Sequence, residues 1–348
     1  MRMPGVVEMG DTVTVADILD ALDKITGGRV CRRASDLFSG RNRFVVTKSS
    51  GLPGKAVTET PGLVFGDPSQ EVKKLAVCMT LTEGHIELAG ATGVNAIVSH
   101  HPVADAANSG GVPLKTYAAL YGIAVFELHE AFHGLHPGIA FLHGHKVFRV
   151  DIAYGGIPGN VMAVGKALDG VRTAGDILRR LATYMAYDDE ARMMEAERRV
   201  RKSNAIVEAN AVTAGVILHG SESSPVGTII HIHPHTGFTP AHLEQAVREH
   251  PDADTVICSI SRASEGSPLV RKAADLGLTF IVGNSHAMEI LENGVPLAIA
   301  LRMMLPQLEI VVFRERVSSY PISDIGTPAI REYGREMAEK YLVRSEGV

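Results

Sequence analysis

The feature that most constrains this chain is the run Ala96-Ile-Val-Ser-His-His-Pro-Val103. A short apolar run bounded by Gly93 and Pro102 is typical of a buried strand, which the proline ends because it has no N–H. His100 and His101 would therefore lie at the carboxyl end of a strand, where open α/β sheets bind ligands. Successive side chains point to opposite faces of a strand, so these imidazoles could serve two different metal ions. A chance His-His pair in a turn is the alternative.

Length and composition indicate the class of protein. The chain has 348 residues, enough for about two domains. Its hydrophobic fraction is 45% and it has no tryptophan, which is typical of an α/β protein rich in small aliphatic side chains. A net charge of −5 gives no basic footprint, so we expect no nucleic-acid partner.

Cysteine usage and hydropathy bear on location. Cys31, Cys78 and Cys258 form no Cys-x-x-Cys pair and favour a reducing compartment. No apolar run approaches the roughly 20 residues needed to span a bilayer. Asp11 and Asp17 near the start are not typical of a signal peptide. We therefore expect a cytoplasmic protein with no membrane partner.

Two stretches have the pattern of a βαβ unit. Residues 62–79 predict strand, turn and strand, and a helix over 83–91 then leads to the His-His strand. Further along, a strand over 227–235, a helix over 239–250 and a strand over 255–260 repeat the order. This alternation predicts an α/β fold with two α/β domains, each a mixed sheet flanked by helices.

A second histidine motif follows the strand predicted over 123–128. The pentapeptide His129-Glu-Ala-Phe-His133 matches the zinc-protease signature, which requires both histidines one turn apart on a long helix. Here the motif directly follows a strand and is cut short by Gly134 and Pro137, so the protease interpretation is disfavoured. A single helical turn would still place His133 on the same side as His129, where both could bind metal.

Further candidate ligands lie late in the chain. His231, His233 and His235 alternate along one strand and share a face, which suggests an additional metal site, substrate contacts, or simply polar residues of an edge strand. His286 and Glu289 are three residues apart at the start of a predicted helix, so they share a helical face.

The charged segment at residues 190–207 also needs an explanation. It predicts a helix carrying several arginines. A solvated or subunit-facing surface is a better explanation than phosphate binding.

Five segments in order resemble the Nif-three-like dinuclear-metal family, also labelled GTP cyclohydrolase I type two. They are the opening helix at Val15–Leu22, the Gly-Asp-Pro strand region at 62–74, the His-His-Pro strand at 97–102, the strand ending in His129, and the closing motif at 283–289 with a last strand at 308–313. The resemblance covers most of the chain, and the His-His-Pro strand is its most specific part.

This resemblance implies two divalent metal ions close together. The implied ligands are His100, His101, His286 and Glu289, with His129 nearby. The chain diverges where the family places a ligand aspartate, because it has His133 there. Replacing a carboxylate with an imidazole shifts the expected ion toward zinc, iron or nickel, with manganese as a further possibility. The family also implies a homo-oligomer, a hexamer of stacked trimers.

Two function classes follow from such a site. The first is a metal-dependent hydrolase acting on a small-molecule substrate, a cyclic amide, purine-type ring or phosphoester, with Glu130 or His129 as general base. The second is a non-catalytic carrier of iron or another metal, a metallochaperone. A purely structural metal is disfavoured, because structural zinc sites are normally closed and rich in cysteine.

The expected domain organisation is discontinuous. Residues 1–150 and 275–348 would form one α/β domain, interrupted by a second domain over 151–274, with the metal site between the early and late segments. The rival architecture is an amidohydrolase barrel, in which His231-Ile-His233 would open the first strand. Too few βα repeats follow that strand to close a barrel.

Overall fold

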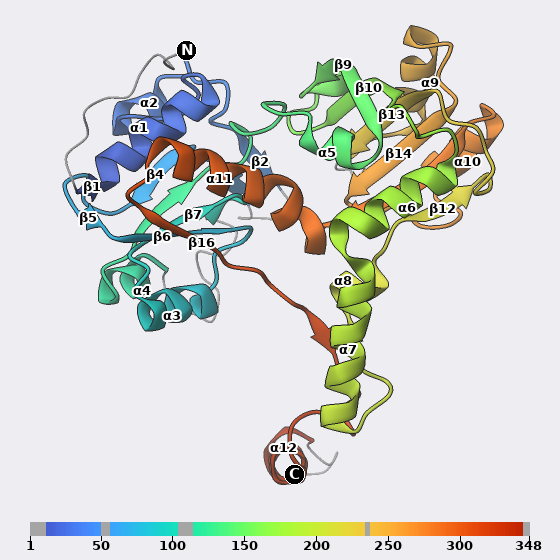
Figure 1. Ribbon diagram of the computed structural model, residues 1–348. Helices are drawn as coiled ribbons and strands as arrows, with labels where there is room; N and C mark the ends of the chain where they lie inside the picture. Colours follow the sequence, from blue (N-terminus) through green and yellow to red (C-terminus); the bar gives the residue numbers. More distant parts are fainter. Residues whose placement is uncertain (1–11, 50–55, 104–113, 234–236, 344–348) are drawn as a thin grey trace.

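The computed structural model describes residues 12–49, 56–103, 114–233 and 237–343. Two mixed sheets, each with helices on both faces, lie side by side and form two α/β domains (Figure 1). This arrangement confirms the predicted fold class, with the early and late segments of the chain meeting between the two sheets.

The first sheet has five strands in the order β16-β6-β7-β8-β4. Its strands are β4 (Gly62–Phe65), β6 (Lys74–Cys78), β7 (Ala96–Ser99), β8 (Ala124–Glu127) and β16 (Glu309–Val312). All neighbours pair in parallel except β4, which runs antiparallel to β8. The His-His strand β7 is therefore central, and all four of its residues are buried.

Helices cover both faces of this sheet. On one face lie α1 (Val15–Thr26) and α11 (Val295–Met304), and on the other lie α3 (Glu83–Thr92) and α4 (Leu114–Leu120). Helix α1 begins at a capping box between Thr14 and Asp17 and ends at Gly27, whose left-handed conformation suits glycine. Its fully buried Ile18 and Leu22 pack in one core cluster with Val98 of β7, which fixes the central strand.

The second sheet has six strands in the order β12-β15-β14-β13-β10-β9. They are β9 (His145–Asp151), β10 (Val161–Ala167), β12 (Val216–His219), β13 (Thr228–His233), β14 (Thr255–Ile260) and β15 (Thr279–Ser285). The three central strands β13, β14 and β15 are parallel, as the second βαβ pattern predicted, and the outer pairs are antiparallel.

Helices also cover this sheet on both faces. Helix α6 (Ala174–Met185) packs on one face, and α9 (Pro240–Glu249) and α10 (Pro268–Asp275) pack on the other. The short α5 (Gly138–Leu142) contacts β9. Strand β13 lies between β10 and β14, so the interpretation of its histidines as edge-strand residues is wrong.

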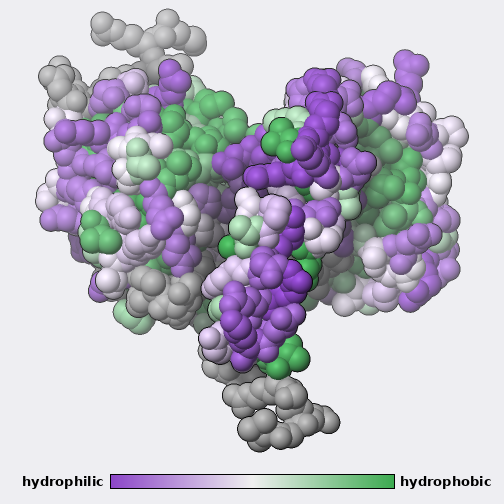
Figure 2. Space-filling view, turned by 90° about the horizontal axis from the view of Figure 1, so that it is seen from below, coloured by the Kyte–Doolittle hydropathy of each residue, from purple (hydrophilic) through white to green (hydrophobic). Residues whose placement is uncertain are grey.

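A group of helices projects away from both domains (Figure 1). It contains α7 (Tyr187–Arg201), α8 (Ala209–Val212) and α12 (Pro328–Met337), with a π-helical turn at Ala338–Leu342. The chain after β16 reaches this projection through β17 (Ser318–Ser319), which pairs with β11 (Val207–Glu208). Seen from below, the projecting helices carry mostly hydrophilic side chains (Figure 2).

Smaller elements complete the described part of the chain. Strand β1 (Val13–Thr14) pairs with β5 (Glu71–Val72), and β2 (Thr47–Ser49) pairs with β3 (Ala56–Thr58). A 3₁₀ turn lies at Tyr154–Gly156 and a five-residue helix, α2, at Ala34–Phe38. Among the described residues, no helix is both long and apolar enough to cross a membrane.

One segment differs from its predicted form. The helix expected from His286 begins as a 3₁₀ turn (His286–Met288), passes through a π-helix (Ile290–Gly294) and becomes regular only in α11. The domain bounds at residues 150 and 275 stay a prediction. Strand β9 extends across the first bound and β15 lies after the second, and both belong to the six-stranded sheet.

Candidate metal centre

The predicted ligands come together where β7, β8 and β15 end. His100 and His101 follow β7, where their N–H groups donate to Cys78 and Met79 carbonyl oxygens at 3.0 and 2.7 Å. These bonds continue the pairing with β6 for two residues after the strand. His129 follows β8, and His286 follows β15 of the other sheet. Strand ends from both domains thus supply the cluster, as expected for open α/β sheets.

Three histidines form the first group of candidate ligands. One nitrogen each of His100, His129 and His133 lies within 4.8 Å of the other two. The rings of His129 and His133 are 4.7 Å apart between centroids, and His100 lies 5.3 and 5.9 Å from them. His133 reaches the group because residues 129–133 form a turn, with the Phe132 N–H donating to the His129 carbonyl at 2.8 Å. The long helix required by a zinc protease is not formed there.

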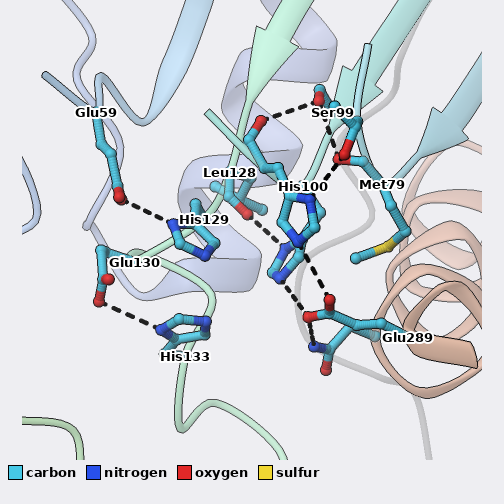
Figure 3. Close-up of polar contacts among 12 residues, drawn as sticks. Glu59, Met79, Ser99, His100, Leu128, His129, Glu130, His133 and Glu289 are labelled. Atoms are coloured by element: carbon cyan, nitrogen blue, oxygen red, sulfur yellow. Dashed lines mark hydrogen bonds and ion pairs between the residues drawn. The ribbon is translucent and has the colours of Figure 1, made fainter. Parts of the chain in front are cut away.

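Each of these three rings has a partner at Nδ1. His100 Nδ1 lies 2.9 Å from the Leu128 carbonyl oxygen. His129 Nδ1 lies 3.0 Å from Glu59 Oε2, and His133 Nδ1 lies 3.2 Å from Glu130 Oε2 (Figure 3). Such contacts fix ring orientation and direct the other nitrogen, Nε2, toward a ligand.

The second group contains His101, His286 and Glu289, which also place ligand atoms within 4.8 Å of one another. His101 Nδ1 lies 2.8 Å from Thr80 Oγ1, and the His286 ring donates a hydrogen bond to the Ile260 carbonyl oxygen. Ile260 has φ 65°, a left-handed conformation that β-branched residues rarely adopt. Such strain is typical of functional sites, and here it aims a carbonyl group at a candidate ligand.

Glu289 joins the two groups. Its Oε1 lies 3.3 Å from His100 Nε2 and its Oε2 lies 3.1 Å from His101 Nε2. The Asn293 amide, one helical turn later, also donates to Oε1 at 3.1 Å. Burial raises the pKa of Glu289, but hydrogen bonds and charge from the two histidines outweigh it, so its pKa lies well below the ordinary value. The carboxylate is therefore ionised and directed at both groups.

The pKa is lowered for two of the candidate imidazoles. Desolvation lowers the pKa of His100, partly offset by Glu289, and it also lowers the pKa of His286. Both rings are thus favoured in the neutral form that binds metal.

A cleft between the domains gives access to the cluster. Its volume is about 440 Å³, within the range of small-molecule sites. Its lining includes the candidate ligands His101, His129, His133, His286 and Glu289, together with Glu130 and His233. Residues 157–160 and Gly237 also line it.

The predicted histidines of β13 separate into different environments. His233 lines the cleft, and its ring lies 6.0 Å from that of His133. His231 is instead buried in a hydrogen-bonded chain, with Nδ1 3.0 Å from His145 Nε2 and Nε2 2.7 Å from Ser259 Oγ. Desolvation lowers the pKa of His233 to about 3 and that of His231 well below its ordinary value. His235 lies outside the described residues.

Several residues at the site were not predicted from sequence. Asn293 is four residues after Glu289, so helical spacing could have revealed it. Glu59, Thr80 and Ile260 carried no comparable signal, because each reaches the cluster only through tertiary folding.

The fold and the cluster define a class of protein: a two-domain mixed α/β protein with histidine–glutamate groups that could hold metal ions. Residues 54–108 match the family model described as Duf34/NIF3 (NGG1p interacting factor 3). The match includes β6, β7, His100 and His101. Over these residues the chain is similar to that family, which supports the resemblance found in its motifs.

Solved structures share this fold. The chain is similar to reduced HcgD from Methanocaldococcus jannaschii, with a TM-score of 0.52, 15% identity, and coverage of 88% of this chain and 99% of HcgD. It is also similar to the hypothetical protein SA1388 from Staphylococcus aureus, with a TM-score of 0.50, 15% identity, and coverage of 86% and 96%. At such identities the likeness concerns the fold alone. A sequence search of curated proteins gave no match.

Proposed function

We propose that the protein holds two divalent metal ions and uses them to hydrolyse a small molecule. The observation that carries this proposal is the position of Glu289, whose two oxygens face His100 and His101. One ion would be held by His100, His129 and His133, and the other by His101, His286 and Glu289.

The donor atoms fit borderline metal ions. The first group supplies imidazole nitrogens alone, and the second supplies two imidazoles and one carboxylate. Such donors suit zinc, iron or nickel better than magnesium or calcium, which prefer oxygen ligands. His133 stands where the family has an aspartate, so that carboxylate is lost. A different carboxylate, that of Glu289, still lies between the two groups, because it faces both His100 and His101.

The cleft supports a hydrolase with a small substrate. Two ions in such a site supply Lewis acidity, activating water and polarising a carbonyl or phosphoryl oxygen. The cleft volume of about 440 Å³ suits a cyclic amide, a purine-type ring or a compact phosphoester. His233 and Asn160 line the cleft and could contact the substrate. Glu130 as general base stays a prediction, as does His129 in the case that it does not bind the ion; both line the same cleft.

One observation favours a second function, that of a metal carrier. His286, in the second group, is solvent-exposed, whereas His100 and His133 are buried. An exposed ligand allows another molecule to reach the ion, so the second ion could be transferred while the first stays bound. An iron carrier or metallochaperone would use such an exchangeable site.

Elemental analysis of anaerobically purified protein tests these proposals. About two ions per chain would support the dinuclear hydrolase and justify assays with cyclic amides and phosphoesters. A single iron that leaves readily to a chelator would favour the carrier. His101→Ala and His286→Ala should lower metal content with unchanged circular dichroism. Protein without metal, or unchanged metal in both variants, would contradict the site.

We also propose a homo-oligomer, a hexamer in keeping with the resemblance. Helix α12 supports an oligomer, because none of its residues is buried and its apolar side chains Ile330 and Tyr333 are exposed.

A cytoplasmic location is supported by three free cysteines, Cys31, Cys78 and Cys258. The two-domain division at residues 150 and 275 is likewise kept as a proposal.

A further inference from the structure

Two buried glutamates flank the three-histidine group on the side away from Glu289 (Figure 3). Glu59, between β3 and β4, is 2% exposed, and Glu130, in the turn after β8, is 5% exposed. A carboxylate buried to this extent is costly unless it is paired. Each of these two contacts the Nδ1 atom of one histidine, at 3.0 Å in the Glu59–His129 pair and 3.2 Å in the Glu130–His133 pair.

The same pattern occurs at the third histidine, where His100 Nδ1 faces the Leu128 carbonyl oxygen at 2.9 Å. All three rings therefore use Nδ1 for an oxygen of the protein. An imidazole that donates from Nδ1 carries its lone pair on Nε2, and at His100 the partner is a carbonyl oxygen, which can only accept, so the tautomer of that ring is fixed as well as its orientation. With Nδ1 facing an oxygen, His129 and His133 keep Nε2 for a ligand, while His100 Nε2 faces Glu289 Oε1 at 3.3 Å, on the side of the second group.

Charge gives the glutamates a second effect. The second group includes a carboxylate of its own, Glu289, whereas the first consists of imidazole donors alone. A carboxylate hydrogen-bonded to an imidazole increases the basicity of the other ring nitrogen. Glu59 and Glu130 can thereby provide negative charge to an ion that they do not touch.

We propose that Glu59 and Glu130 are positioning residues, which hold His129 and His133 with Nε2 directed at one metal ion shared with His100. This inference rests on the proposed dinuclear site. It assigns the two glutamates to the three-histidine ion and leaves the ion at His101, His286 and Glu289 independent of them.

Paired substitutions separate charge from orientation. In Glu59→Gln the amide oxygen can still accept from Nδ1, so only the charge is lost, whereas Glu59→Ala removes both. The same pair applies to Glu130. We expect the Gln variants to bind the first ion about tenfold more weakly, and the Ala variants up to about a hundredfold. Zinc affinity is measured on the full chain by competition with a chromogenic chelator.

Cobalt spectra provide a readout that a merely structural role would not change. Co²⁺ replaces zinc, and its visible absorption reports ligand geometry. The Ala variants should alter the bands of one ion and leave those of the other unchanged. Glu208→Gln is the matched control: Glu208 is a fully buried glutamate whose partners are the Ala211 N–H and Arg316, and its loss should leave zinc affinity within about twofold of wild type.

Three results would overturn the inference. Unchanged zinc affinity and cobalt spectra in all four variants would show that the glutamates do not act on the ion. A third ion per chain that is lost in Glu59→Gln would make the glutamates ligands themselves. Full metal affinity with abolished hydrolysis in Glu130→Gln would make Glu130 a base instead. Absence of metal from the wild-type protein would contradict the dinuclear site itself. A wild type that binds metal with variants that bind it equally well would contradict only the role of the two glutamates.

Discussion

Glu289 Oε2 lies 3.1 Å from His101 Nε2, although 188 residues separate them along the chain. The contact joins the end of β7, in the five-stranded sheet, to the turn after β15, in the six-stranded sheet. Because the other oxygen of Glu289 faces His100 at 3.3 Å, one buried carboxylate links both candidate ion positions. Its substitution should therefore affect both ions.

We predict that Glu289→Gln lowers metal content from about two ions per chain to less than one. His286→Ala should remove only the exposed ion, because His286 belongs to one group alone. Both variants are compared with wild type by elemental analysis after gel filtration. Equal losses in the two variants would contradict a linking role for Glu289.

Metal removal gives the second prediction. An ion that binds only the folded state stabilises it, by about 2.7 kcal/mol when present at a hundred times its Kd. Treatment with a chelator should therefore lower the thermal midpoint, and zinc should restore it. In Glu289→Gln the midpoint should respond little to either treatment. A midpoint that is insensitive to chelator in the wild type would argue against tightly bound metal.

The third prediction concerns Glu292, which is fully buried in the π-helical turn. Desolvation, with a contribution from Glu289, raises its pKa to about 8, while the Asn284 amide bonded to Oε1 opposes the shift. Between pH 4.5 and 8 the folded protein keeps a proton that the unfolded chain has released. Stability contributed by Glu292 therefore falls as pH rises through this window, by up to about 1.4 kcal/mol per pH unit.

Glu292→Gln removes this titration while keeping an oxygen that accepts from Asn284. We expect the variant to gain stability relative to wild type as pH rises from 5 to 8, with little difference near pH 4.5. Urea denaturation of metal-free protein at four pH values measures this trend. A constant difference across the range would mean that the carboxyl group is ionised in the folded state.

The sequence predicted those parts of the site that follow from local pattern. The strand ending in His100 and His101 was readable because an apolar run and a proline define its end within eight residues. His286 and Glu289 were readable from spacing, although π-helical geometry, rather than a regular helix, carries the chain into α11. The turn that brings His133 back to His129 was also anticipated.

Other parts depend on contacts between distant segments. Period-two spacing correctly placed His231 and His233 on one face, but it could not distinguish the buried ring from the one lining the cleft. That difference arises from His145, on β9, a strand that was not predicted. Glu59 reaches His129 across 70 residues, and no local pattern marks such a pair.

A fourth prediction tests the packing that supports β15. A β-carbon at Gly283 would lie 2.1 Å from His143 Nε2. The fully buried His143 ring cannot easily move, because Nδ1 faces the Ile139 carbonyl oxygen at 2.8 Å and Nε2 accepts the Asn284 N–H at 3.2 Å. Gly283→Ala should therefore destabilise the protein by about 1–3 kcal/mol.

Gly84→Ala is the control for that substitution. Gly84 lies in the first turn of α3, and an added β-carbon would make only an ordinary contact of 3.7 Å with Thr82 Oγ1. It should be neutral or stabilising by up to about 1 kcal/mol. If both substitutions had the same effect on denaturant unfolding, close packing between β15 and His143 would not explain the result.

The last prediction concerns the projecting helix α12. A helix of 10 residues is marginal in water unless it packs on something, yet none of its residues is buried. Ile330 and Tyr333 are 52% and 57% exposed, and a second copy of the chain would cover them in the proposed oligomer. Ile330→Asp with Tyr333→Asp should reduce the assembly to smaller species in light scattering. Glu332→Gln, on the same helix, should leave it intact. An unchanged mass in the double variant would place the subunit contacts elsewhere.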